Sequence, residues 1–362
     1  MNNYIEYNDS VAFHPGYYIK EIVDESGLSQ EDFARRLGTT PKNLSILLRG
    51  DQSLSIEMAT KLSRLLGTSV SYWLNLQQAF DEKLAEILSA QDMEKERDII
   101  RLIDYNYFRN NYDLPDLPRK TDEKIIRLRS FLAVSSLTVL ENKDLTVNFR
   151  SGTAQLSRSN IVNANAMVQM AVNSALGRKT PKYNKQKFAD AVEFALTQTC
   201  NHNSFLPAVK EAFADAGVVL VILRDLKNSG ISGATKHLGG RILLMVNDKR
   251  HYEDTFWFTL FHEIGHIVNG EMGISVDNNS ESASDTEHAA DEYARNMLIP
   301  ADAYQRFIKY ERTFDESGIR RFASEIGRDP GIVYGRLQKD RLIAYSERLL
   351  SSKLRHRFNA EQ

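Results

Sequence analysis

The chain has 362 residues, a length that predicts two or three domains rather than one. Its 46 Lys and Arg against 48 Asp and Glu leave a formal net charge of -2, which excludes a chain-wide basic field for nucleic acid but not a local basic face. The single cysteine, Cys200, excludes an internal disulfide framework and any cysteine-rich zinc site.

The same features favour a cytoplasmic protein. A lone cysteine fits a reducing compartment. The first residues, MNNYIEYNDS, lack a basic segment followed by an apolar run, so we expect no signal peptide. The longest apolar stretches, near residues 218–223 and 242–246, have the length of strands and not of membrane spans.

The first domain is predicted at residues 10–80 and consists of short helical patterns separated by glycines. Residues 29–37 (SQEDFARRL) begin with the capping pair Ser29 and Asp32. Residues 41–49 (PKNLSILLR) begin with a proline. Proline lacks a backbone N–H, but N–H groups in the first turn of a helix make no hydrogen bond within the helix, so nothing is lost. Gly38-Thr39-Thr40 forms a tight turn between them. Two such helices, with polar residues at the start of the second, are typical of a helix-turn-helix.

The segment from His14 to Phe80 resembles the XRE-type helix-turn-helix domain of HigA-like antitoxins. The motifs that carry the resemblance are His14-Pro15-Gly16, Leu28-Ser29-Gln30, Phe33-Ala34, Leu37-Gly38, Leu44-Ser45, Gly50 and the run SYWLNLQ at residues 71–77. The resemblance implies a homodimer on a double-stranded DNA operator with paired half-sites. It also implies that Gln30 and Lys42 contact phosphates or base edges, and that Thr40, Asn43 and Ser45 face the major groove.

The charge of this segment leaves a second interpretation open. Residues 14–80 contain seven Lys and Arg and seven Asp and Glu, so DNA affinity would depend on one local face. The alternative is a helix bundle used only for dimerisation or for binding a partner protein.

A helical middle region is predicted at residues 81–185. We expect a helix from about residue 81 to 107, then a loop with Pro115 and Pro118 that would serve as a hinge between domains. Residues 122–180 have a mostly helical pattern. The basic run from Arg178 to Lys187 is interpreted as a solvated loop and a helix start.

The third domain is predicted at residues 186–350 and mixes strands with helices. Residues 217–223 (GVVLVIL) predict a buried strand, and two glycine-separated apolar segments at 231–246 predict further strands. Residues 256–268 and 287–298 are predicted helices. The expected fold class is therefore α+β: an all-α helix-turn-helix domain, a helical middle, and a C-terminal domain with a small sheet.

A zinc motif lies in the first of these C-terminal helices, at residues 257–266 (WFTLFHEIGH). In its His-Glu-x-x-His pattern, His262 and His266 are four residues apart and share one helix face, so both imidazoles can bind one ion. Glu263 lies close enough to reach a water at that ion. Zinc in such a site lowers the pKa of a bound water to about 7, and a carboxylate can then take the proton.

Glu287 is the best candidate for a third ligand, twenty-one residues after His266. Asp291 lies one turn later on the same face and would accept a hydrogen bond from a ligating imidazole. Two histidines and one glutamate leave a fourth position open, which is the catalytic arrangement of zinc. His288 is a competing ligand, although it points about 100° away from Glu287 on an ideal helix.

Both helices resemble the ImmA/IrrE family of zinc metallopeptidases, over about residues 206–338. Residues 256–266 (FWFTLFHEIGH) carry the metal motif, and residues 287–300 (EHAADEYARNMLIP) match the family pattern E-x-x-A-[DN]-x-[FY]-A-x-x-x-L-x-P. The resemblance implies a gluzincin-like fold, Zn2+ held by His262, His266 and Glu287, and Glu263 as general base. It implies proteolysis of a regulatory protein, commonly a DNA-bound repressor. Many relatives have a second acid where this chain has Ala289.

Two functions follow from these patterns. The first is a DNA-binding transcriptional regulator with a zinc-dependent endopeptidase domain, latent until activated or constitutively active, that cleaves a repressor or antitoxin-type protein. The alternative is an antitoxin-like repressor, as in toxin-antitoxin modules, whose zinc domain is a non-cleaving sensor or binds a partner such as a toxin. The residue that would stabilise an oxyanion is not assigned; the residues available are His237, His251, Tyr252 and Tyr293.

A weaker motif lies near the carboxyl end. Phe322-Ala323-x-x-Ile326-Gly327-x-x-Pro330 repeats the spacing of Phe33-Ala34-x-x-Leu37-Gly38-x-x-Pro41. Both predict two helices joined by a glycine turn. Because the second copy has no polar reading face, we interpret it as a packing element or a partner-docking surface, not as a second DNA reader.

Overall fold

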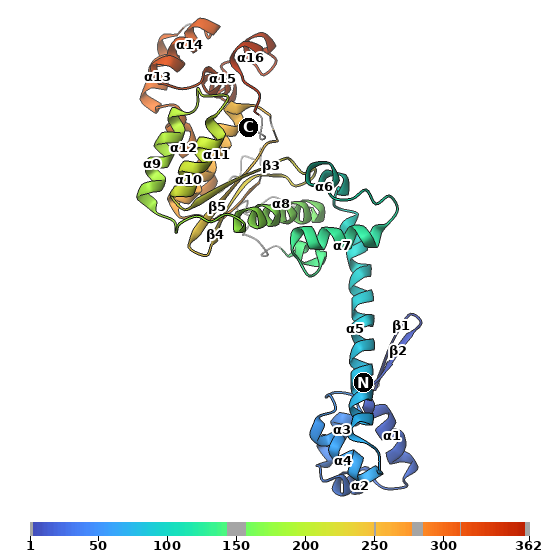
Figure 1. Ribbon diagram of the computed structural model, residues 1–362. Coiled ribbons are helices and arrows are strands. Elements are labelled where there is room, and N and C mark those ends of the chain that lie inside the picture. The colour runs from blue at the N-terminus through green and yellow to red at the C-terminus, as the bar shows by residue number, and fades with distance from the viewer. Residues whose placement is uncertain (1–2, 143–156, 250, 277–284, 312, 359–362) are drawn as a thin grey trace. The chain divides into compact units, whose positions relative to one another are not determined.

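The computed structural model describes residues 3–142, 157–249, 251–276, 285–311 and 313–358 (Figure 1). The chain divides into two compact units, Met1–Lys95 and Glu96–Gln362, and each is described by itself. Within the described ranges, no helix is both long enough and apolar enough to cross a membrane.

The first unit contains a two-stranded hairpin and a bundle of short helices. Its elements are β1 (Tyr4–Tyr7), β2 (Ser10–Phe13), α1 (Pro15–Glu25), α2 (Gln30–Leu37), α3 (Pro41–Leu48), α4 (Ile56–Leu66) and the first part of α5 (Val70–Ile100). The predicted helix pair is confirmed with its local signals. The Ser29 side chain accepts a hydrogen bond from the backbone N–H of Asp32 at the start of α2, and α2 ends at Gly38 in the left-handed conformation, φ 70°.

The helix bundle encloses its own apolar core. Fully or nearly fully buried side chains from each helix meet there: Ile19, Phe33, Ala34, Leu37, Leu44, Leu47, Leu62 and Trp73. Those on α2 and α3 occupy the positions that the apolar spacing of residues 29–49 assigns to the inner face of the helix-turn-helix. The core therefore holds α2 and α3 rigidly, while the opposite face of α3 stays accessible.

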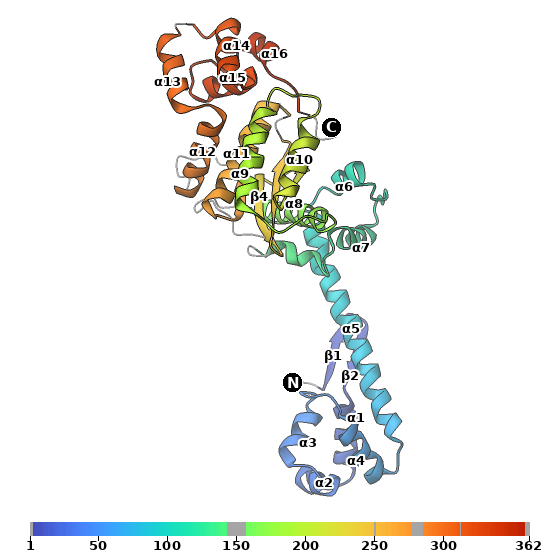
Figure 2. The ribbon, with the colours of Figure 1, turned by 60° about the vertical axis from the view of Figure 1, so that its left-hand side comes forward.

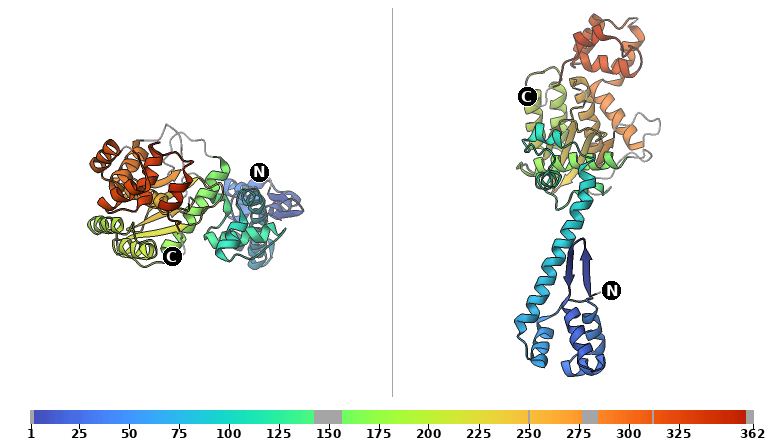
Figure 3. Two further views of the ribbon diagram at one scale, coloured as in Figure 1. Left: turned by 90° about the horizontal axis from the view of Figure 1, so that it is seen from above. Right: turned by 90° about the vertical axis from the view of Figure 1, so that its right-hand side faces the viewer.

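The N-terminal hairpin was not predicted. β1 and β2 pair antiparallel, with Tyr4 opposite Phe13, across a turn in which Asn8 has a φ of 51°. The hydroxyl of Tyr7 donates to Glu94 Oε2 at 2.7 Å, so the hairpin lies along α5 (Figure 2 and Figure 3). The available signal was the Asn8-Asp9 pair between two short runs rich in aromatic and β-branched residues.

The expected helix at 81–107 is wrong at both ends. α5 begins at Val70 and continues without a break to Ile100, and α6 (Tyr105–Tyr112) starts separately. No glycine or proline lies between residues 70 and 100, so nothing in the backbone stops the helix near residue 80. The break comes at Asp104, whose side chain caps α6 by accepting from the N–H of Asn106. The boundary between the two units falls inside α5, whereas the three domain ranges remain a prediction.

The second unit contains a four-stranded sheet and the remaining helices. Its elements are α6, α7 (Thr121–Leu132), the short 3-10 helix η1 (Leu137–Glu141), α8 (Arg158–Leu176), α9 (Lys185–Thr197), α10 (Phe205–Asp215), β3 (Val218–Leu223), β4 (Ile231–Leu238), β5 (Arg241–Asn247), α11 (Glu253–Asn269), β6 (Gly273–Val276), α12 (Asp285–Leu298), α13 (Ala301–Tyr310), α14 (Glu316–Glu325), α15 (Pro330–Lys339) and α16 (Arg348–Leu354). The predicted α+β class is confirmed.

The sheet has the strand order β3-β5-β4-β6. β3 runs parallel to β5, and β4 runs antiparallel to both β5 and β6. The first three strands correspond to the predicted ones. β6 was not predicted, because four residues are too few to show a strand pattern.

Helices cover both faces of the sheet. Alternate residues of β3 and β5, such as Val218, Leu220 and Leu244, join the core formed with α9, α10 and α11. The residues between them, such as Val219 and Leu243, are equally buried, and α8 contacts these strands. Buried faces on both sides explain why β3 reads as a continuous apolar run.

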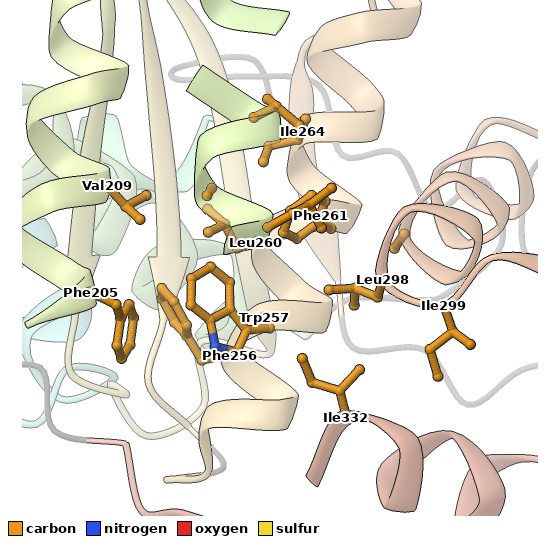
Figure 4. Packing of buried hydrophobic residues seen from close by; sticks show 14 of the residues in the cluster. Phe205, Val209, Phe256, Trp257, Leu260, Phe261, Ile264, Leu298, Ile299 and Ile332 are labelled. Carbon is orange, nitrogen blue, oxygen red and sulfur yellow. The ribbon is translucent and has the colours of Figure 1, made fainter. Parts of the chain in front are cut away.

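The main core forms where α11 meets α10 and the C-terminal helices. Trp257 and Phe261 of α11 are fully buried, and Trp257 packs against Phe205 of α10 with ring centroids 4.8 Å apart (Figure 4). Leu298 of α12 and Ile332 of α15 close the other side. Apolar contacts with α10, α12 and α15 therefore fix the position of α11.

The repeated Phe-Ala motif forms two helices, as predicted. α14 and α15 are joined by a turn in which Gly327 has a φ of 65°. Phe322, Val333 and Tyr334 are buried in the main core, so one face of this pair packs into the second unit.

Candidate metal centre and recognition helix

The two histidines of α11 lie one turn apart and point to the same place. His266 is fully buried and His262 is 8% exposed. Their Nε2 atoms are 3.1 Å apart. The apolar residues of α11 pack into the core, and the face that carries both histidines is turned toward α12.

Glu287 of α12 completes a cluster of three potential ligands. Its Oε2 lies 3.1 Å from His262 Nε2, and its Oε1 lies 3.4 Å from His266 Nε2. α12 can approach this closely because Gly265 faces it. A Cβ at residue 265 would lie only 3.1 Å from the Cα of Ala290. A glycine between the two histidines therefore sets the spacing between the helices.

The donor set and its spacing fit a zinc ion. Two imidazole nitrogens and one carboxylate oxygen are ligands that zinc prefers, and the three ligand atoms lie within 4.8 Å of one another. Ligand atoms of a tetrahedral zinc with bonds of about 2.0–2.1 Å stand about 3.3 Å apart. The separations of 3.1, 3.1 and 3.4 Å match that value. Three protein ligands also leave one position for a substrate or water.

Each histidine of the cluster has a carboxylate beside its Nδ1. Asp291 Oδ1 is 2.9 Å from His262 Nδ1, in the arrangement expected from the sequence, and Arg295 donates to the other Asp291 oxygen at 3.0 Å. Glu271 Oε2 is 3.2 Å from His266 Nδ1. These contacts fix each ring so that Nε2 faces Glu287. Glu271 was missed, although its position just after Gly270, which ends α11 in the left-handed conformation, was a usable signal.

The carboxylates make this site strongly favourable for positive charge. Burial by itself lowers the pKa of His262, but hydrogen bonds with Asp291 and Glu287 raise it to about 10. Burial alone would raise the pKa of Glu287, and the two imidazoles lower it to about 2. A proton or a metal ion between these groups is therefore stabilised, and a divalent ion would satisfy all three ligands at once.

Glu263 lies beside the histidines, between α11 and β4. It is fully buried. Gly233 of β4 leaves the space that its side chain occupies, because a Cβ at residue 233 would lie 2.5 Å from Glu263 Oε1. The side chain of Glu263, the predicted general base, thus packs directly against the backbone of β4 at Gly233. Gly233 was not singled out from the sequence.

The remaining candidates do not join the cluster. His288 and Ala289 are exposed on α12, and His288 is absent from the group of potential ligands among the described residues. His237 is exposed on β4, and Tyr252 stacks its ring under the guanidinium of Arg355 at 3.9 Å. Burial is the main cause that raises the pKa of Tyr293 to about 12. Its hydroxyl therefore stays protonated and can donate a hydrogen bond. The oxyanion role remains unassigned among His237, His251, Tyr252 and Tyr293.

The predicted DNA-contacting residues lie at the start of α2 and along α3. Gln30, Thr40 and Lys42 are exposed, and Asn43 and Ser45 are partly exposed. Thr40 caps α3 by accepting from the N–H of Asn43 at 3.1 Å. The amide side chain of Asn43 donates to Thr39 Oγ1 and accepts from Gln52, both at 3.0 Å. Ser45 Oγ accepts from Arg49 at 2.9 Å. These contacts orient the polar face of α3, and their role toward DNA remains a prediction.

Two family models match the chain. A helix-turn-helix model (HTH_3) matches residues 19–73, and an IrrE N-terminal-like domain model (Peptidase_M78) matches residues 214–337. The second range contains the metal cluster, and the first contains α2 and α3. The resemblances to the XRE and ImmA/IrrE families are therefore confirmed.

Curated relatives match about a quarter of the chain. The uncharacterized HTH-type transcriptional regulator YddM of Escherichia coli (strain K12) is 41% identical over 86 residues, which are 24% of this chain and 89% of that protein. Virulence-associated protein I of Dichelobacter nodosus is 32% identical over 80 residues, which are 22% of this chain and 74% of that protein.

Solved structures match over a similar share. An addiction module antidote protein of a HigA family from Coxiella burnetii is 31% identical, with 24% of this chain and 94% of that chain covered and a TM-score of 0.22. A Pseudomonas aeruginosa protein in complex with its operator DNA is 27% identical, with the same coverage and a TM-score of 0.22.

Proposed function

Because this chain belongs to the HTH-type transcriptional regulators through its first unit and carries a Peptidase_M78 domain in its second, we propose that it is a DNA-binding regulator with a zinc-dependent endopeptidase activity. The observation that carries the proposal is the convergence of His262, His266 and Glu287 beside the buried carboxylate of Glu263. A structural zinc site would need four protein ligands, whereas this cluster offers three.

The chemistry assigned to each residue follows from its position. Zinc held by His262, His266 and Glu287 would supply a Lewis acid that polarises the carbonyl of the scissile peptide bond. Glu263 takes a proton from the attacking water and later gives it to the amine that leaves. Asp291 and Glu271 keep both imidazole rings oriented, so that Nε2 stays available and Nδ1 stays protonated.

The proposed substrate is a repressor or antitoxin-type regulatory protein. A helix-turn-helix on the same chain would bring the peptidase to an operator, where other DNA-bound regulators are found. Tethering raises the effective concentration of the peptidase at such a protein without any further contact. We propose that the chain binds its operator as a homodimer, since helix-turn-helix proteins commonly read paired half-sites.

Removal of the metal is expected to abolish cleavage. The chain would be dialysed against a chelator and incubated with the regulatory protein encoded by the neighbouring gene. Intact substrate would be followed by gel electrophoresis, with and without added Zn2+. Cleavage that returns with zinc supports the proposal. Cleavage by metal-free protein, verified by elemental analysis, would refute the zinc dependence.

The recognition helix is tested by replacing Lys42 and Asn43 with Ala. Each lost contact to a base edge or phosphate is expected to cost about 1–3 kcal/mol, so operator affinity should fall at least about tenfold in a gel shift. Loss of the lysine should also make binding less dependent on salt. Lys20→Ala, an exposed lysine on α1, is the matched control. An unchanged gel shift for the double variant would remove α3 as the reading helix.

A further inference from the structure

A second group of metal-ligating side chains lies in the same unit, apart from the centre described above. His202 is in the loop between α9 and α10, Asp329 caps α15, and His356 follows α16 near the end of the described chain. The ligand atoms of these three residues lie within 4.8 Å of one another. The sequence predicted nothing here, because His202 lies more than one hundred positions before Asp329 and His356, and no motif links the three residues.

This group has the same ligand types as the first centre, two imidazoles and one carboxylate, at wider separations. His202 Nε2 is 3.5 Å from Asp329 Oδ2, and His356 Nε2 is 3.9 Å from the same oxygen. Glu253 Oε2 is 2.6 Å from His202 Nδ1 and orients that ring from behind, as Asp291 orients His262. The other oxygen of Asp329, Oδ1, accepts from the N–H of Gly331, so Oδ2 is the oxygen turned toward the histidines.

The charges around this group call for a cation. Asp329 and Glu253 are each 3% exposed, so their negative charges are costly unless a cation lies beside them. The positive groups that face both are His202 and His356. Their rings stack, with centroids 3.7 Å apart and planes at 23°. A divalent ion bound by both imidazoles and Asp329 would compensate the two buried carboxylates.

We propose that His202, Asp329 and His356 bind a second divalent ion of the zinc class. Two imidazoles and a carboxylate select such an ion over magnesium or calcium, which prefer oxygen ligands alone. The ion would tie separate segments of the chain together and leave a fourth position for water. His356 belongs to a segment that pairs with the start of α11. Glu253 N–H donates to His356 O at 3.0 Å, and Phe358 N–H donates to His251 O at 2.9 Å. The ion would join this segment to α15 and to the loop at His202.

Metal titration of the full chain tests the proposal. Metal-free protein is titrated with Co2+, and the visible absorption of bound cobalt reports the number of equivalents. We expect two equivalents for the wild type and one for His356→Ala. Glu287→Ala should also bind one, and the double variant none. His288→Ala, an exposed histidine outside both groups, is the matched control and should bind two.

Thermal unfolding gives an independent measurement. In the Glu287→Ala background, added Zn2+ should raise Tm, and this rise should disappear when His356→Ala is added, as ligand binding to the folded state predicts. Because the side chain of His356 is 47% exposed, its replacement should leave the core intact, and circular dichroism would check the fold.

Each outcome has a distinct meaning. One equivalent in both the wild type and His356→Ala, with no Tm response in Glu287→Ala, would overturn the second site. Loss of one equivalent in His356→Ala but not in Glu287→Ala would uphold it and refute the first centre instead. The inference therefore does not depend on the proposed peptidase activity.

Discussion

Replacing Glu263 with Gln is expected to abolish proteolysis while the metal stays bound. The amide keeps the size and shape of the side chain but cannot accept the proton of the attacking water. General-base catalysis of this kind contributes about 10²–10⁴-fold, so the rate of substrate cleavage should fall by that factor. Glu263 is not among the three ligands, and elemental analysis should find the same metal content as in the wild type.

The matched control is Glu292→Gln, the same change at an exposed glutamate of α12. It should cleave at the wild-type rate. If Glu263→Gln cleaves normally, or if cells that carry it respond as the wild type does, the peptidase proposal fails. The chain would then be interpreted as an antitoxin-like repressor whose metal domain senses a signal or binds a partner.

Gly233→Ala is expected to reduce cleavage nearly as much, through a different cause. The new Cβ would lie 2.5 Å from Oε1 and 2.6 Å from both Cδ and Cγ of Glu263. Contact with Cγ means that the whole side chain must move, not only its end. A shift of about 1 Å in a catalytic group can cost about 10²-fold in rate. The overpacked contact should also lower the free energy of unfolding by about 1–3 kcal/mol.

Kinetics and thermal unfolding together check this prediction. Gly177→Ala is the control, because Gly177 has an ordinary φ of -69° and the nearest atom to its new Cβ would be 3.7 Å away. Adding Gly233→Ala to Glu263→Gln should slow cleavage little further, since both changes remove the same proton transfer. Full activity in Gly233→Ala would mean that the carboxylate works from another position.

Local periodicity explains what could be predicted from the sequence. His262 and His266 share a helix face by their spacing, and Asp291 follows Glu287 by one turn for the same reason. The pairing of Ser29 with Asp32 is likewise decided within four residues. In each case the contact forms within one helix or between two helices that a known motif places together.

Contacts between distant segments could not be predicted in this way. Gly233 matters only because β4 passes beside α11, and Glu271 only because the chain turns back after Gly270. The long helix α5 was misjudged for a related reason. The expected domain boundary suggested a break near residue 80, but the local sequence contains no residue that stops a helix there.

The single cysteine, Cys200, offers a place to attach a fluorescent label near the proposed second metal site. Cys200 is exposed and lies two residues before His202, one of the three residues of the proposed second site. A maleimide dye would therefore attach at one place per chain without any engineered residue. Its fluorescence could follow occupancy of that site in real time, separately from the proteolytic centre, during operator binding and substrate cleavage.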